Sequence, residues 1–237
     1  DGLIWLHPVT DRLETAPAAV RRQARKLICL NLCFEDDAVL CVLRDDRAAV
    51  GALTRRLIER GYRRIGYLGG SEDQLFARWR YGGFADALQA GRRAVEPGIV
   101  VPYSTGSQYS DGVAAARTLL RAGDPPDALV CVTDSLAAGV AAALREAGLA
   151  VPDDVVVTGF DNRPEYRDIV PSLTTVDPAS PEMGRVAAAL LLAQLAGTIQ
   201  PGGRHFVPCR LVLRPPVGEE EGPAAPARRK AKGERGR

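Results

Sequence analysis

The chain has few of the residues on which most catalytic and metal sites depend. Among its 237 residues are two histidines, His7 and His205, and three lysines, none of which follows a glycine. Two histidines so far apart lack the ligand spacing of a zinc site, and the lysines exclude a Walker A phosphate loop. The motifs GxGxxG, GxSxG and HExxH are absent as well. We therefore expect no enzymatic activity, no cofactor and no metal.

Long apolar runs are also missing. No run approaches the ~18 residues that a membrane-spanning helix needs, and no basic segment followed by an apolar one opens the chain as a signal peptide would. The five cysteines are an odd number without CxxC spacing. This pattern predicts free thiols in a reducing compartment, the cytoplasm.

The net charge is small and unevenly placed. Lys and Arg outnumber Asp and Glu by 31 − 29 = +2, and residues 218–237 hold six of the basic and four of the acidic side chains. The rest of the chain is therefore neutral, 25 against 25. A domain that binds duplex DNA usually has a basic face, so the neutral body argues against DNA binding by this part. Residues 218–237 are expected to be a disordered tail.

Short apolar runs alternate with segments of helical periodicity through most of the chain. Such alternation predicts a parallel α/β sheet with right-handed crossovers. The chain opens directly on one of the apolar runs, which indicates a piece of something longer. The expected strands are 2–6, 27–32, 39–43, 65–68, 99–103, 128–132, 155–160 and 206–213, the last of them broken by Pro208 and therefore an edge or a crossing segment. The expected helices are 46–59, 77–90, 110–122, 134–147 and 183–195, with Asp134 as the cap of the fourth.

Polar residues follow several of the predicted strands. In open α/β sheets ligands bind at the carboxyl ends of the strands. Asp45, Ser107, Thr133 and Asp161 come just after such strands, and Arg80 lies early in a predicted helix. An arginine and carboxylates that converge there suit a polyhydroxylated ligand, because sugar hydroxyls both donate and accept hydrogen bonds. Taken singly, each residue is as well explained as a helix cap or a structural salt bridge.

Six short motifs then follow one another in order: IGYLGG, RYGGF, TDSLAAG, GFDN, LTTV and EMGR, at residues 65–70, 80–84, 133–139, 159–162, 173–176 and 182–185. In this order they resemble the effector-binding domain of the lactose-repressor (LacI/GalR) family of bacterial transcription regulators. The stretch DDRAA at 45–49 is similar to that family's Asp-Asn-x-x-Ala stretch. The resemblance covers about residues 1–217.

The resemblance implies a two-lobed α/β fold of the periplasmic-binding-protein-like type I, with parallel sheets flanked by helices. Residues 1–61 and 177–205 would form an incomplete first lobe, and residues 62–176 and 206–217 the second. The chain would cross between lobes near Gly61, Val176 and His205. The family's DNA-binding headpiece, hinge helix and first strand–helix units would all precede Asp1.

The resemblance also implies a site and partners. An effector, a sugar or similar polar molecule, would lie between the lobes, in a homodimer that reaches operator DNA only through the headpiece. The alternative is a periplasmic sugar-binding receptor of an ABC transporter. Three departures from the family pattern concern the effector: Ser107 replaces a frequent aromatic ring, Asp46 a usual asparagine, and Asp177-Pro178 a frequent Arg/Lys-Gln. The implied effector-facing residues are Arg80, Asp161, Asp45, Ser107, Thr133, Gln74 and Phe76.

Overall fold

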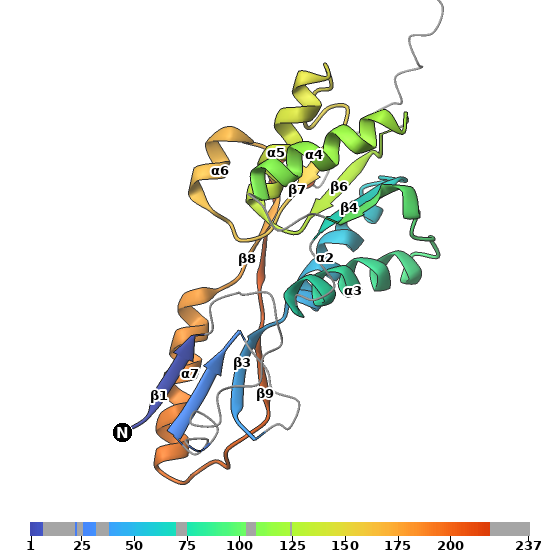
Figure 1. The fold of residues 1–237 in the computed structure, drawn as a ribbon. Coiled ribbons are helices and arrows are strands. Elements are labelled where there is room, and N and C mark those ends of the chain that lie inside the picture. Colours follow the sequence, from blue (N-terminus) through green and yellow to red (C-terminus); the bar gives the residue numbers. More distant parts are fainter. Residues whose placement is uncertain are drawn as a thin grey trace, which may run out of the picture.

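A computed structural model of the chain describes residues 1–6, 22, 26–31, 38–69, 75–102, 108–123 and 125–218. These residues form two lobes joined by extended segments (Figure 1). Each lobe is built on a parallel sheet with helices packed against it. The predicted fold class is therefore confirmed.

The first lobe holds a four-stranded parallel sheet in the order β1-β2-β3-β9. One face packs against α7 through Ile28, Val42, Met183 and Ala187, all of which are buried. The strands and the helix are β1 (Leu3–Leu6), β2 (Leu27–Leu30), β3 (Leu40–Arg44), β9 (Arg204–Val207) and α7 (Ser180–Leu195).

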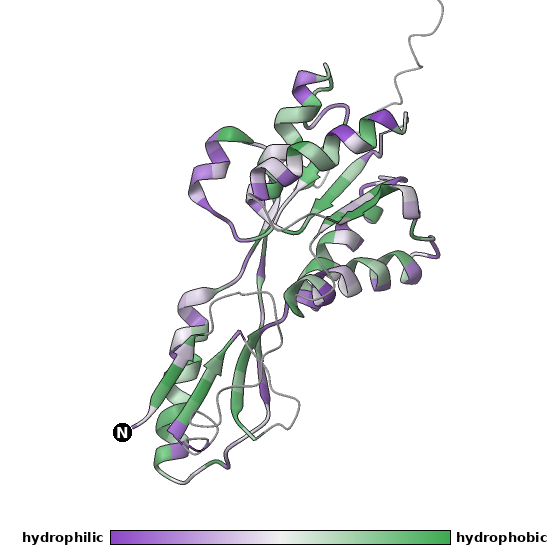
Figure 2. Cartoon of the chain, viewed as in Figure 1, coloured by the Kyte–Doolittle hydropathy of each residue, from purple (hydrophilic) through white to green (hydrophobic). Residues whose placement is uncertain are grey.

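The second lobe holds a four-stranded parallel sheet in the order β5-β4-β6-β7, with a helix pair on each face. Its strands are apolar on both sides because both faces are covered, and Figure 2 shows the hydrophobic residues concentrated there. The elements are α2 (Asp46–Glu59), β4 (Ile65–Gly69), α3 (Leu75–Ala90), the 3-10 turn η2 (Pro97–Ile99), β5 (Val100–Pro102), α4 (Gln108–Arg121), β6 (Ala128–Cys131), α5 (Asp134–Glu146), β7 (Val156–Thr158) and α6 (Pro164–Ile169).

Both helix pairs pack closely through glycine. A Cβ atom at Gly83 of α3 would overlap the backbone oxygen of Arg47 in α2, and one at Gly139 of α5 would overlap that of Tyr109 in α4. Only glycine permits so close an approach of two backbones. The α2/α3 and α4/α5 pairs thus use the same packing solution on opposite faces of the sheet.

The predicted division of the chain at residue 61 is wrong. Helix α2 was assigned to the first lobe, but its Val50, Leu53 and Leu57 pack in the core of the second lobe with Tyr67 and Phe84. The chain crosses between lobes just before α2, where Arg44 ends β3 and Asp45 caps the helix. The cap lets the helix begin at the crossing itself.

The third crossing also differs slightly from the prediction. Strand β9 stays in the first sheet as far as Val207, so the crossing follows it instead of lying at His205. The strand predicted over 206–213 is interrupted at Pro208, as expected: β9 ends at Val207, and β10 (Arg210–Val212) pairs antiparallel with β8 (Thr175–Asp177). The second crossing leads from β8 to α7. The predicted tail beyond residue 218 lies outside the described residues.

Candidate ligand-binding site

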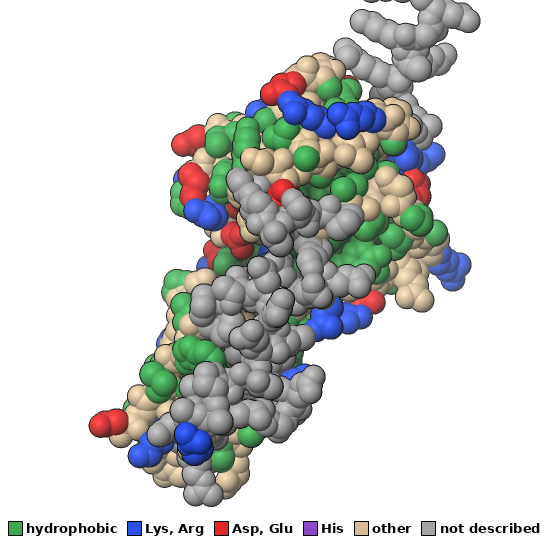
Figure 3. All heavy atoms as spheres, in the orientation of Figure 1, with side chains coloured by type: hydrophobic (Ala, Val, Ile, Leu, Met, Phe, Trp, Pro, Cys, Tyr) green, Lys and Arg blue, Asp and Glu red, His purple; other side chains and the backbone are tan. Residues whose placement is uncertain are grey.

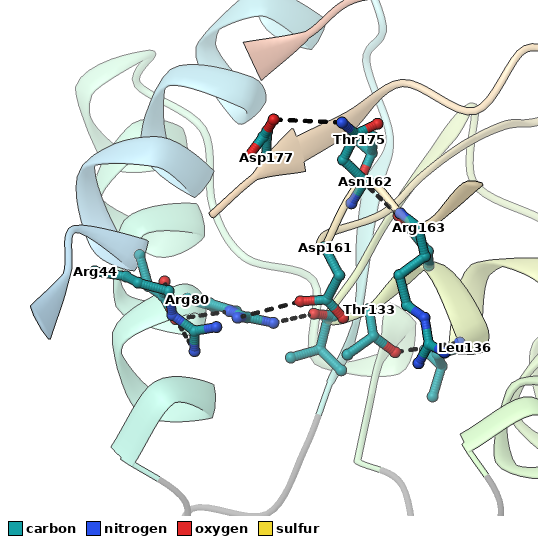
Figure 4. A network of polar contacts seen from close by, with 12 residues as sticks. Arg44, Arg80, Thr133, Leu136, Asp161, Asn162, Arg163, Thr175 and Asp177 are labelled. Atoms are coloured by element: carbon teal, nitrogen blue, oxygen red, sulfur yellow. Dashed lines mark hydrogen bonds and ion pairs between the residues drawn. The ribbon is translucent and has the colours of Figure 1, made fainter. Parts of the chain in front are cut away.

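A cluster of charged side chains lies where the two lobes meet. Arg44 ends β3 of the first sheet, Asp46 begins α2, and Asp161 follows β7 of the second sheet. Arg80 comes from α3 and reaches both Asp46 and Asp161. Figure 4 shows Arg44, Arg80 and Asp161 lying close together. The carboxyl ends of the strands thus bring together residues that are far apart in the sequence.

Arg80 is buried, with 2% of its surface exposed. Its Nε donates to Oδ2 of Asp46 at 2.9 Å, and its Nη1 donates to the carbonyl of Val132. Its Nη2 lies 4.0 Å from Oδ1 of Asp161. Burial by itself would lower the pKa of Arg80, but the carboxylates of Asp46 and Asp161 outweigh it, so the pKa is raised.

Two aromatic rings lie close to this guanidinium. The Arg80 Cζ lies 3.4 Å from the ring centroid of Phe160 and 5.0 Å from that of Phe76. Phe76 is four residues before Arg80, so both occupy one face of α3. Both rings attract the cation electrostatically.

Asp46 binds a second arginine. Its Oδ1 lies 3.3 Å from Nε of Arg44, and the side chain of Asp46 is 1% exposed. Burial lowers the pKa of Arg44, while the charge of Asp46 opposes that effect. The carboxylate of Asp46 therefore joins an arginine of the first sheet to an arginine of the second lobe.

Asp161 is the more accessible carboxylate, with its side chain 28% exposed. It sits on a sharp turn, because Asp161 and Asn162 both have positive φ, 111° and 50°. Its backbone N–H donates to the carbonyl of Val176 at 2.9 Å, which fixes the turn against β8. Burial raises the pKa of Asp161, against the opposing charges of Arg80 and Arg44. Non-glycine residues at positive φ often mark functional positions.

Thr133 and Asp45 are helix caps in this structure. The Thr133 hydroxyl accepts from the Leu136 N–H at 3.2 Å and donates to the side-chain oxygen of Gln108 at 3.0 Å. Asp45 accepts from the Ala48 N–H at 3.0 Å. Asp134 was predicted to cap α5, but the cap is Thr133.

Asp134 is instead the first residue of α5 and is buried behind Asp161. Its Oδ2 accepts from the backbone N–H of Arg163 at 2.9 Å, and its Oδ1 accepts from the hydroxyl of Thr175. Burial raises the pKa of Asp134 to about 6, against these two hydrogen bonds, which lower it. The site thus contains a second buried carboxylate, which accepts its hydrogen bonds from an uncharged hydroxyl and a backbone N–H.

Helix α3 also contacts the first lobe. Trp79, the neighbour of Arg80, packs against the buried residues of β2 and β3, and its ring lies 5.8 Å from that of Phe206 in β9. Arg80 therefore sits on a helix that touches both lobes.

The structure brings three of the predicted site residues together: Arg80, Asp161 and Phe76. Asp45 and Thr133 lie at the same sheet edges but serve as caps, and Gln74 and Ser107 lie outside the described residues. Sequence reasoning missed Arg44 and Phe160 as members of the cluster. Both carried a signal, since each ends an apolar run directly before one of the aspartates already singled out.

The sequence over residues 54–215 matches the model of the periplasmic binding protein-like domain family. The match begins within α2 and continues through α3, the second sheet, α7, β9 and β10. The chain belongs to this family. The two-lobed α/β arrangement is therefore that of a periplasmic binding protein-like domain.

Relatives of this periplasmic binding protein-like domain support the resemblance found in the motifs. The repressor CytR of Escherichia coli strain K12 is 31% identical over 170 residues, 72% of this chain and 49% of CytR. The transcriptional regulator CelR in complex with cellobiose has a TM-score of 0.77 and 28% identity, over 90% of this chain and 65% of that one. A LacI family regulator from Mycobacterium smegmatis has a TM-score of 0.76 and 25% identity, over 90% and 77%. The chain spans about half the length of the curated relatives it matches.

Two further observations concern the length and polarity of the helices and the charges on the surface. In the described part of the chain, every helix is too short or too polar to span a membrane. On the visible face of the second lobe, acidic and basic side chains are interspersed (Figure 3).

Proposed function

We propose that the chain is the effector-binding domain of a bacterial LacI-type transcriptional regulator, which binds a sugar or similar small polar molecule between its two lobes. The observation that carries the proposal is the cluster of Arg44, Arg80 and Asp161, where strand ends of both lobes meet. Relatives named as the repressors CytR and PurR, and the CelR–cellobiose complex, support this function over a transport receptor.

In this proposal the chain works as a two-state sensor. A ligand that touches both lobes stabilises the lobe angle at which its contacts are best. The chain crosses between the lobes three times, and a change of angle would move Trp79 of α3 relative to β2 and β3. The ligand would bias this angle, and the bias would reach a DNA-binding headpiece outside this chain.

The same proposal assigns the remaining roles. Operator contact belongs to the headpiece, since the body of this chain carries no net charge. The regulator acts as a homodimer, because a two-fold operator calls for a two-fold protein, and it works in the cytoplasm with neither a cofactor nor catalytic chemistry of its own. Asp161 accepts hydrogen bonds from ligand hydroxyls.

Calorimetric titration with neutral mono- and disaccharides, cellobiose among them, tests the function. We expect at least one saccharide to bind the chain saturably and the Asp161→Asn variant to bind it at least ~10-fold more weakly, ~1.4 kcal/mol. Asp168→Asn, on the exposed surface of α6, is the matched control and should bind as the unchanged chain does. Absence of binding by every saccharide, or equal binding by Asp161→Asn, would contradict the proposal.

A further inference from the structure

From the charges around Arg80 we infer that the site selects uncharged ligands, and that Asp46 is the residue that sets this selectivity. The inference rests on the proposed function and adds the chemical class of the ligand: a neutral polyhydroxylated molecule in preference to a phosphorylated or carboxylated one. Asp46 acts through Arg80 and is a positioning residue.

The first step is that Arg80 is already engaged by the protein. Each of its three nitrogens faces a protein oxygen, on Asp46, Val132 or Asp161. The rings of Phe160 and Phe76 also lie near the group, with centroids 3.4 and 5.0 Å from its Cζ. A ligand anion would have to displace a buried carboxylate to form a forked contact with this arginine.

The second step concerns the other arginine. Arg44 is directed at Asp46 through two nitrogens, Nε at 3.3 Å and Nη2 at 3.5 Å. Its side chain is 15% exposed. The single carboxylate of Asp46 therefore neutralises part of the positive charge of both guanidinium groups.

The third step is the sum of the charges. The two positive charges of Arg44 and Arg80 are balanced by the negative charges of Asp46 and Asp161. Asp45 adds a third carboxylate beside Asp46. Arg163 also lies near Asp161, but it is exposed and hydrogen-bonds Glu165 at 2.7 Å. The cluster thus has no excess of positive charge, and an incoming anion would face the carboxylate of Asp161.

Asp161 determines which ligands the site favours. Its side chain is the most exposed of the four charged groups in the cluster. An ionised carboxylate only accepts hydrogen bonds, so it favours ligands that present hydroxyl or amino donors. Neutral sugars satisfy this requirement, whereas a phosphate ester carries a negative charge that the Asp161 carboxylate repels.

The test uses inorganic phosphate as the probe on the whole chain. We expect no saturable phosphate binding by the unchanged chain and a gain of at least ~10-fold in phosphate affinity in Asp46→Asn, ~1.4 kcal/mol. Asn keeps the shape of Asp46 but frees the charge of Arg80. If Asp46 had a purely structural role, the Asp46→Asn variant would lose saccharide binding and would gain no affinity for phosphate.

Two further variants show whether the gained phosphate affinity comes from the freed charge of Arg80 or from the loss of any nearby carboxylate. Asp46→Asn combined with Arg80→Gln should lose the gained phosphate affinity, because the freed guanidinium is removed. Asp45→Asn removes a carboxylate of the same stretch that caps α2 and makes no contact with Arg80, and it should gain less than Asp46→Asn. Circular dichroism melts establish that each variant is folded.

A measurement on the unchanged chain keeps the inference testable if Asp46→Asn does not fold. Glucose and glucose 6-phosphate, or cellobiose and its phosphate monoester, should differ at least ~10-fold in favour of the neutral member. Tighter binding of the ester, or saturable phosphate binding by the unchanged chain, would overturn the inference. If no saccharide binds but Asp46→Asn alone gains phosphate, the proposed function fails while the charge assignment stands.

Discussion

Helices α2 and α5 begin in the same way but differ in the partners of their first residue. Each is capped by the preceding side chain, Asp45 or Thr133, and each starts with an aspartate that is 1% exposed, Asp46 or Asp134. Asp46 binds the guanidinium groups of Arg80 and Arg44. Asp134 binds the Thr175 hydroxyl and a backbone N–H.

This difference shows how one helix-start geometry produces two chemistries. Asp46, which lies between two arginines, is part of a charge-balanced cluster at the lobe junction. A carboxylate among neutral donors has a pKa raised to about 6 by burial, and it can change charge near neutral pH. The two helix pairs share their glycine packing, so they differ in the partners of the aspartate that begins α2 or α5 and not in how their helices approach.

Removing the α3 arginine that pairs with Asp46 should have the largest effect. Arg80→Ala leaves Asp46 buried beside one arginine only and opens space between Phe160 and Phe76. Breaking a buried ion pair from one side costs about 3–5 kcal/mol, and we expect a loss of that size in the free energy of unfolding by urea. Arg78→Ala, an exposed arginine of the same helix, is the control. Equal stability of the two variants would show that the pair with Asp46 contributes little.

The titration of Asp134 should appear in the pH dependence of stability. Its folded-state pKa of about 6 lies above the ordinary value of 3.8, so the folded chain holds this proton more tightly than the unfolded chain does. Stability is then greatest below the ordinary pKa and falls as the pH rises through about 6.

The size of this effect follows from the shift. We expect the unchanged chain to lose on the order of 3 kcal/mol relative to Asp134→Asn between pH 4 and pH 7. Urea unfolding at several pH values measures it, with Asp168→Asn on exposed α6 as the control. Parallel curves for the unchanged chain and Asp134→Asn would refute the assignment.

The glycine contacts should give the smallest effects and separate the two helix pairs. Gly83→Ala and Gly139→Ala each force a methyl group against the backbone of the facing helix, which costs about 1–3 kcal/mol. Only Gly83→Ala should also weaken saccharide binding, because it separates Asp46 from Arg80. Gly184→Ala in α7 meets no neighbouring atom and should not destabilise the chain. Equal loss of binding in both pairs would contradict this distinction.

Much of the fold follows from local signals in the sequence. The helix periodicity and the polar caps predict α2, α4 and α5 to within two residues at either end. Helix α6 was not expected, because Pro164–Ile169 has too few apolar residues to show a period. The lobe boundary was misplaced because the apolar face of α2 does not reveal which of two sheets it will cover.

The site was predictable only in part. Strand-end positions indicate Asp45, Thr133 and Asp161, because the carboxyl ends of parallel strands meet at one edge. The pairing of Arg80 with Asp46 depends on how α3 lies against α2, which no local pattern fixes. The stacking of Arg80 on Phe160 likewise joins a helix to a turn 80 residues further along the chain.

The most direct test is a crystal structure of the chain with a saccharide that binds it. We predict a ligand hydroxyl within hydrogen-bond distance of the Asp161 carboxylate, between the lobes, with the contact between Arg80 and Asp46 unchanged. A saccharide bound away from Asp161, or an Arg80 turned from Asp46 onto the ligand, would contradict the account.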